Sequence, residues 1–258
     1  MPPTPLHTAS TEPPKTVVPL NEVAYGVHFI APDFSAVHFG EYYERVKQRF
    51  PEYQDQPPIL RPTNVPNQLE VPPLPRVWFT RGSRLVQLQM DRLVYNWRHG
   101  HDQAEYPGYN ALFSEFREEW LDFREFSKAA FAIPLSLIEL NLTYVNYIHE
   151  VTDTGTPVFS FQQNDWLHDV QLDLWSTQLR FSFPNENLRL AVATGPAIQV
   201  ATQKAANSLS LIVQSMTVPN IDDRAAIFDW FDAAHAKVHW AFRTLVRPEL
   251  RRRWGFNE

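Results

Sequence analysis

Histidines and carboxylates gather in one short segment whose residue types could bind a metal ion. His99, His101, Asp102 and Glu105 all lie within it. Zinc and iron accept imidazole nitrogen and carboxylate oxygen as ligands in proteins. A polar loop after a strand has the same composition, so this segment is a candidate only. We expect neither a metal nor any other cofactor.

A second group of the same residue types lies near the C-terminus, where the sequence predicts a helix. Asp232, His235 and His239 are spaced i, i+3 and i+7, which places them along nearly one edge of a helix. The two histidines have zincin spacing, but Ala236 occupies the position of the general-base glutamate. We therefore predict that the imidazoles flank the apolar stripe and form hydrogen bonds with a neighbouring strand.

Familiar catalytic motifs are absent from the sequence. The chain has no cysteine, which excludes thiol nucleophiles and disulfide frameworks. Its eight glycines form no phosphate-binding loop and no nucleophile elbow. The sequence favours a binding protein over an enzyme.

Polar residues within strands that otherwise look buried are the remaining candidates for a site. They must contact water, be satisfied internally or line a cavity. A binding face for another protein is the leading interpretation. A small-molecule or hydrolase pocket is the alternative, and it requires Asn96, Glu139, Asn146 and His235 to converge. The candidate ligand- or partner-binding residues are Asn96, Arg98, Glu139, Tyr144, Asn146 and His235.

Arginines near the C-terminus form a further candidate site. Arg251, Arg252 and Arg253 could contact phosphates, and an exposed Trp254 could stack on a base. The helix macrodipole favours cations at such a position in any case. The net charge of -6 also opposes nucleic-acid binding, so we expect a protein partner rather than a nucleic acid.

Hydrophobic periodicity predicts the elements that position these residues. An apolar stripe predicts a helix over 109–131, with Glu119 and Arg124 on its solvated side. In the strand predicted over 85–98, Val86, Leu88 and Met90 face one way, towards the core. Other strands are predicted over 23–29, 76–80, 138–148, 178–183, 188–193 and 209–218, and other helices over 39–50 and 221–247.

The order is β-α-β-β-α-β, then a β-meander and a long helix. Its first half has the order of a ferredoxin-like unit, although one curved sheet holding the C-terminal helix fits equally. Both arrangements are α+β, with a mostly antiparallel sheet and helices on one face.

Two proline-rich stretches frame the domain organisation. The first predicts a disordered leader over residues 1–18, and the second, over 57–75, an extended connection. Residues 19–258 then form a single domain. The sequence has no signal-peptide pattern and no apolar run long enough to span a bilayer, so we expect a cytoplasmic protein with no membrane contact.

Short motifs recur in order along the chain and carry a resemblance. They are Pro19-Leu20-Asn21-Glu22-Val23, Asn96-Trp97-Arg98, Tyr106-Pro107-Gly108-Tyr109, Glu139-Leu140-x-Leu142-x-Tyr144-x-Asn146-x-Ile148, Ala234-His235 and Trp254-Gly255. Together they resemble a sporadically distributed prokaryotic family of uncharacterised proteins of similar length. Because mobile defence and toxin-antitoxin genes have such a distribution, the resemblance implies an accessory or antitoxin-like partner protein in such a system.

Overall fold

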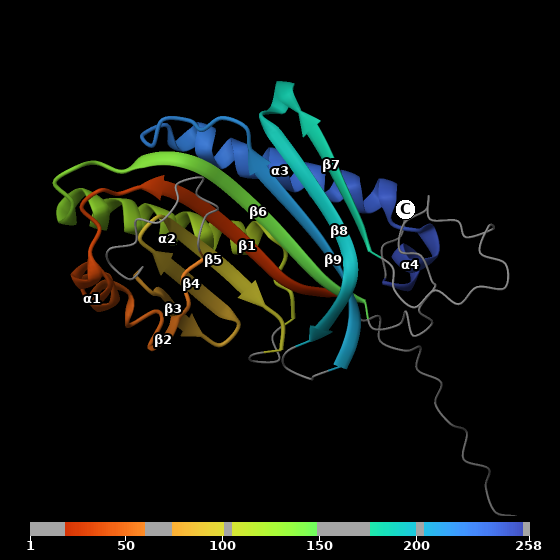
Figure 1. The fold of residues 1–258 in the computed structure, drawn as a ribbon, viewed down its shortest axis with the longest axis horizontal. Helices are drawn as coiled ribbons and strands as arrows, with labels where there is room; N and C mark the ends of the chain where they lie inside the picture. The colour runs from red at the N-terminus through yellow and green to blue at the C-terminus, as the bar shows by residue number, and fades with distance from the viewer. Residues whose placement is uncertain (1–18, 60–73, 101–104, 149–175, 200–203, 255–258) are drawn as a thin grey trace, which may run out of the picture.

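The computed structural model describes residues 19–59, 74–100, 105–148, 176–199 and 204–254 (Figure 1). The predicted leader over residues 1–18 lies outside these ranges, and so do the interior of the second proline-rich stretch and His101.

The described strands form one nine-stranded sheet in the order β2-β3-β4-β5-β1-β6-β9-β8-β7 (Figure 1). Every neighbouring pair is antiparallel. The strands are β1 Leu20–Ile30, β2 Glu52–Gln56, β3 Arg76–Arg81, β4 Arg84–Gln89, β5 Arg92–Arg98, β6 Ser136–Ile148, β7 Thr177–Phe183, β8 Leu188–Gln199 and β9 Lys204–Ser215.

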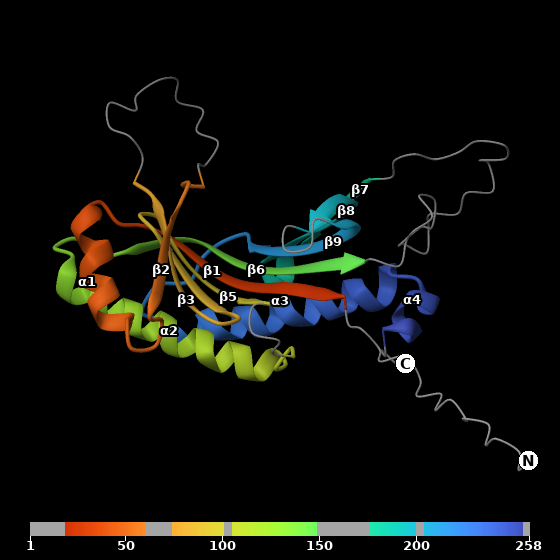
Figure 2. The same cartoon turned by 90° about the horizontal axis from the view of Figure 1, so that it is seen from below.

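The helices lie on one face of this sheet, as Figure 2 shows. They are α1 Ala36–Val46, α2 Tyr109–Ala130, α3 Arg224–Leu245 and α4 Pro248–Arg253, with a 3₁₀ turn over Pro184–Glu186. The predicted α+β class is confirmed. The long C-terminal helix is α3, and Pro248 begins the short α4, a position where proline's missing N–H costs nothing.

The predicted strand over 85–98 is in fact a hairpin. A turn at Met90 and Asp91 divides it into β4 and β5, and Met90 is 41% exposed instead of facing the core. The additional reversal places two strands, β4 and β5, between β3 and β1 in the sheet order, where the prediction had one. All nine strands form one continuous sheet, and α3 packs on it (Figure 2).

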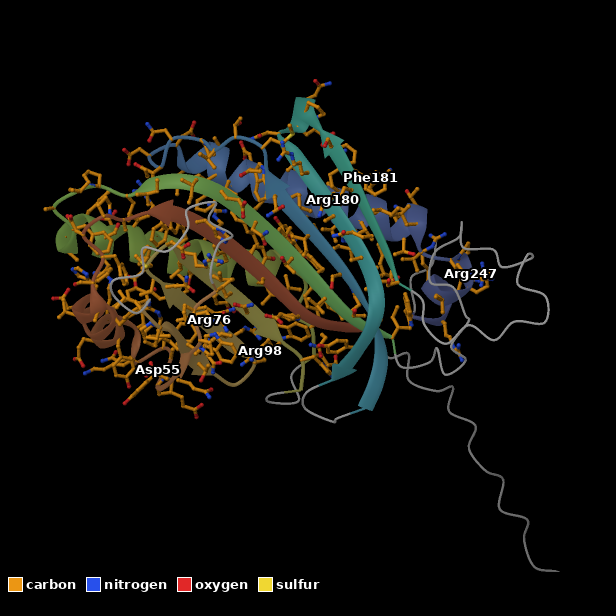
Figure 3. The ribbon with its side chains drawn as sticks, in the orientation of Figure 1. Asp55, Arg76, Arg98, Arg180, Phe181 and Arg247 are labelled. Atoms are coloured by element: carbon orange, nitrogen blue, oxygen red, sulfur yellow. The ribbon has the colours of Figure 1, made fainter. Side chains whose placement is uncertain are left out.

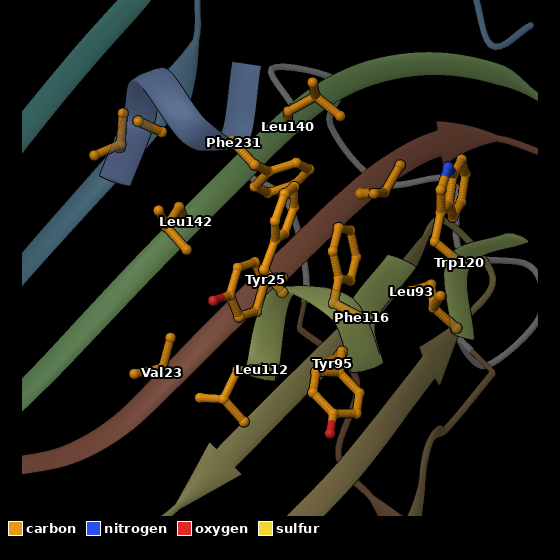
Figure 4. Packing of buried hydrophobic residues seen from close by; sticks show 14 of the residues in the cluster. Val23, Tyr25, Leu93, Tyr95, Leu112, Phe116, Trp120, Leu140, Leu142 and Phe231 are labelled. Atoms are coloured by element: carbon orange, nitrogen blue, oxygen red, sulfur yellow. The ribbon is translucent and has the colours of Figure 1, made fainter. Parts of the chain in front are cut away.

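Aromatic side chains join the sheet to both long helices (Figure 4). The ring of Tyr25 on β1 stacks on Phe116 of α2 with centroids 5.1 Å apart. Phe116 packs edge-on against Phe231 of α3 at 4.8 Å. Aromatic pairs of this kind add to the stabilisation from buried area alone, so β1 is the centre of the core.

The charged side of α2 is only partly solvated, which corrects the prediction for Glu119 and Arg124. Both side chains are buried. Glu119 accepts two hydrogen bonds from Arg49 at 2.9 Å each, and Arg124 donates to Asp222 at 2.6 Å. The segments after α1 and before α3 cover this flank, which helical periodicity alone does not reveal.

One further feature of the helices concerns membranes. Within the described ranges, no helix is both long and apolar enough to cross a bilayer.

Candidate binding face of the sheet

The sheet has a second face, opposite the helices, which we call the helix-free face. Side chains alternate between the two faces along each strand. On β1, Tyr25 points towards the helices, whereas Glu22 belongs to the other set. Within the part of the chain that the structure describes, no helix covers this second face (Figure 2).

Two arginines and a tryptophan form the centre of the helix-free face, and we call Arg76, Trp78 and Arg98 the arginine–tryptophan cluster. The guanidinium carbon of Arg98 lies 4.7 Å from the centroid of the Trp78 ring, and that of Arg76 lies 5.2 Å from it. Both distances are in the range of cation–π contacts. Figure 3 places Arg76 and Arg98 close together on the face turned towards the viewer.

A chain of amides connects this cluster to a carboxylate. Gln87 Oε1 accepts from Arg76 and from Trp78 Nε1, each at 2.9 Å. Gln87 Nε2 donates to Asn96 Oδ1 at 2.6 Å, and Asn96 Nδ2 donates to Glu22. The amide positions are thus fixed, and Gln87 holds the side chains of Arg76 and Trp78 in place.

The charges of this group are only partly compensated. Burial raises the pKa of Glu22, against the opposing effects of Asn96, Arg98 and Arg76. Burial lowers the pKa of Arg76 and that of Arg98. The Nε atoms of both arginines are buried and have no hydrogen-bond partner. Buried donors without acceptors are rare in folded proteins, and both side chains as a whole are only half-buried.

The second proline-rich stretch begins beside this cluster. The backbone N–H of Ile59 donates to Gln89 at 2.9 Å, and its carbonyl accepts from Gln89 at 3.1 Å. The same carbonyl accepts from Arg92 at 3.3 Å, and Arg92 also pairs with Asp91. Arg92 is therefore already compensated, unlike its two neighbours on this face.

Of the six predicted ligand- or partner-binding residues, the structure brings Asn96 and Arg98 together. Glu139 shares their face, but its carboxylate pairs with His28 at 3.3 Å. Asn146 lies an odd number of positions further along β6, so its side chain points to the helix side of the sheet. This side chain is buried and donates to the carbonyl of Leu209. Asn96 and Glu139 therefore lie on the helix-free face, whereas Asn146 lies on the opposite face of the sheet. The predicted pocket of Asn96, Glu139, Asn146 and His235 does not form.

Tyr144 and His235 instead meet on the helix side. With Tyr109 they form what we call the tyrosine–histidine cluster. The Tyr144 hydroxyl and His235 Nδ1 lie 3.0 Å apart, which confirms that this imidazole forms a hydrogen bond with a neighbouring strand. Burial, and secondarily His239, lowers the pKa of His235 to about 3, so the imidazole is neutral.

The metal hypotheses gain no geometric support. Asp232 accepts a hydrogen bond from the Tyr109 hydroxyl at 2.8 Å. The exposed His99 is described, but its predicted co-ligands His101 and Asp102 lie outside the described residues. Among the residues the structure covers, no three His, Asp or Glu side chains are placed to hold a metal ion.

The C-terminal arginines surround a buried ring. Trp254 is only 3% exposed and packs on Phe242 of α3 with centroids 5.8 Å apart. The predicted exposed stacking platform is therefore wrong, because α4 folds back onto α3. Arg252 and Arg253 are exposed on α4, and Arg251 is half-buried.

Sequence reasoning missed Glu22, Arg76, Trp78 and Gln87 as members of the site. Only the strand register places them together, with Trp78 opposite Gln87 and Leu85 opposite Asn96. The alternating polar residues of two neighbouring strands could have indicated this site. The prediction of one strand over 85–98, in place of β4 and β5, concealed that signal. Comparison with known proteins finds no family model and no curated protein that matches this chain.

Proposed function

We propose that this chain is a protein-binding protein whose helix-free face binds an acidic segment of another protein. The observation that carries the proposal is the arginine–tryptophan cluster, in which the guanidinium groups of Arg76 and Arg98 lie over Trp78 and all three side chains are half-buried. A carboxylate of a partner could pair with the accessible N–H groups of these guanidiniums, and hydrogen bonds between charged groups are the strong ones.

The composition of the cluster supports a protein interface. Arginine and tryptophan are the residue types most enriched among the side chains that dominate binding energy. The rigid amide chain through Gln87 and Asn96 means that little side-chain entropy is lost on binding.

The resemblance to a sporadically distributed prokaryotic family extends this proposal. In a defence or toxin-antitoxin-type system, the partner would be the effector that this chain senses or neutralises. The genes adjacent to those of similar proteins test this part. A constant neighbour encoding a protein with an acidic surface segment supports it, and unrelated housekeeping neighbours contradict it.

The binding proposal is tested with a fluorescein-labelled oligoglutamate peptide and the full chain, by fluorescence anisotropy. Arg76→Gln and Arg98→Gln should each weaken binding by about tenfold, the loss expected when one charged hydrogen bond is removed. Arg252→Gln is the matched control, because this arginine on α4 is 61% exposed and away from the face. Its affinity should equal that of the unaltered protein.

Parallel titrations with oligolysine and oligo(dT) distinguish the rival functions. The proposal expects no binding of oligolysine and much weaker binding of oligo(dT). If oligo(dT) binds more tightly than oligoglutamate, and Arg98→Gln removes that binding, the face recognises phosphate and the protein-binding proposal is wrong. Equal affinities of Arg98→Gln and Arg252→Gln for oligoglutamate also overturn it.

A further inference from the structure

The last strand of the sheet order, β7, has an unpaired side in the described structure. β7 pairs with β8 from Thr177 to Phe183, and no other described strand lies beyond it in the sheet order. Such a strand presents unused backbone N–H and C=O groups that an added strand can pair with. Figure 1 shows β7 at the margin of the sheet, where it crosses in front of α3.

The two sides of β7 differ in chemistry. Towards the helices, Phe181 and Phe183 each pack edge-on against Trp240 of α3 with centroids 5.5 Å apart. Trp240 is 38% exposed, so part of this apolar surface remains accessible to a partner. An added strand would find a hydrophobic contact for every second side chain there.

On the helix-free side, β7 and its neighbour carry positive charge. Arg180 and Arg189 are both exposed, and the register places Ser182 opposite Arg189 and Arg180 opposite Ala191. Within the described ranges neither guanidinium pairs with a carboxylate. By contrast, Lys237 on the helix side is already paired with Glu186 at 2.6 Å.

We infer that β7 receives an extended strand of a partner protein, with acidic side chains facing Arg180 and Arg189 and apolar side chains facing Phe181, Phe183 and Trp240. The site is separate from the arginine–tryptophan cluster, so the inference does not depend on the proposed function. Figure 3 shows Arg180 and Phe181 at one margin of the sheet, away from Arg76 and Arg98.

The charges of the two edge strands favour an acidic strand as the occupant and β7 as the edge that it pairs with. The opposite edge strand, β2, carries exposed Glu52 and Asp55, which repel an acidic segment. A second copy paired through β7 in a centred antiparallel register would bring two Arg180 side chains opposite each other, and like charges there are destabilising. An acidic strand meets neither difficulty.

The test uses the full chain and the peptide acetyl-Glu-Val-Glu-Phe-Glu-Val-amide, which alternates acidic and apolar side chains. Hydrogen exchange measured with and without peptide should show slower exchange of amides in β7 and unchanged exchange in β2. Arg180→Glu should weaken the affinity by about tenfold or more, the scale of losing one charged contact. Arg76→Gln should leave the protection of β7 unchanged.

Arg224→Glu is the matched control, because this arginine is exposed at the start of α3, whereas Phe181 and Phe183 of β7 contact Trp240 near the other end of that helix. Peptide binding without slower exchange in β7, or equal affinities of Arg180→Glu and Arg224→Glu, would overturn the inference. A peptide with lysine in place of glutamate must not bind. If β7 becomes protected with protein concentration alone, the occupant is a second copy and the inference is wrong.

Discussion

The ring of Tyr109 lies flat on the ring of His235, with centroids 3.7 Å apart and planes 4° from parallel. Tyr109 is the first residue of α2 and His235 lies in the middle of α3, so this stack joins the two long helices. The groups that contact His235 are Tyr144 from β6, Tyr109 from α2 and His239 from α3. Burial among these groups disfavours a charge on the imidazole.

The stability of the protein should therefore decrease as the pH falls. The pKa of His235 is lowered to about 3 in the folded protein, whereas in the unfolded chain it is near 6.5. Between these values the unfolded chain binds a proton that the folded protein does not, so the free energy of unfolding falls by up to about 1.4 kcal/mol per pH unit. Urea denaturation at pH 7.5, 6.5, 5.5 and 4.5 measures it.

His235→Gln is the comparison for this pH profile, because glutamine can still bond to the Tyr144 hydroxyl but does not titrate. Glu22 and Glu119, whose pKa values are raised, act in the opposite direction but are present in both proteins. The unaltered protein should lose stability more steeply than His235→Gln below pH 6.5. Parallel profiles would show that this histidine does not titrate between the folded and unfolded states.

The hydroxyl of Tyr144 should contribute measurably to stability. Tyr144→Phe removes the hydrogen bond to His235 Nδ1 and should cost about 1 to 2 kcal/mol, because a polar atom in a largely buried position loses its partner. Tyr147→Phe on the same strand is the matched control, since that side chain is half-buried and points to the other face of the sheet. Equal unfolding midpoints in urea for the two variants would contradict the assignment.

Periodicity predicted most of the fold because its signals are local. The aromatic stripe of α2 and the alternation along β6 both recur as predicted. The turn at Met90 and Asp91 has neither glycine nor proline, so no local signal divided β4 from β5. That one missed turn hid one strand of the sheet order, because β4 and β5 were predicted as a single strand.

The site was less predictable than the fold because it depends on contacts between distant segments. Glu22 and Asn96 are bonded across two strands that lie far apart in sequence, and only their register brings them together. Conversely, Glu139 and Asn146 belong to one strand, but their positions differ by an odd number, so their side chains point to opposite faces of the sheet. Polar composition alone cannot show which polar side chains share a face of the sheet. That requires the strand register, which gives the face of each position.

Replacing Asp222 should cost more stability than replacing Arg124, although the two side chains form one ion pair. Arg124 is 2% exposed and its Nε and Nη1 atoms have no hydrogen-bond partners among the described residues, whereas Asp222 is 74% exposed. Asp222→Asn leaves a buried charge without its counter-ion, which is the costly way to break such a pair. Arg124→Met removes the charge and keeps an unbranched chain in the core.

We expect Asp222→Asn to lower the free energy of unfolding by about 2 kcal/mol, and Arg124→Met to lower it by less. Urea denaturation of both variants and of the double variant measures the difference. Asp223 is the N-cap of α3 and must be kept, since its side chain accepts from Ala226. A larger loss for Arg124→Met than for Asp222→Asn would show that the arginine stem, and not its charge balance, is the important feature.

Glu22 connects stability to binding on the helix-free face. Because burial raises its pKa, the folded protein holds a proton there more tightly than the unfolded chain does, and this contribution to stability is lost as the pH rises through the folded pKa. Glu22→Gln keeps an oxygen for the Asn96 amide and removes the buried charge. It should therefore stabilise the protein more at pH 8 than at pH 4.5.

The same substitution removes the carboxylate that faces Arg76 and Arg98. If these guanidiniums bind acidic partners, Glu22→Gln should tighten the binding of oligoglutamate by a few-fold at pH 8, since one repulsive charge is lost. The increase should shrink at high salt, which screens the charges. A variant that gains stability at pH 8 but binds the peptide no more tightly would place the acidic ligand away from this cluster.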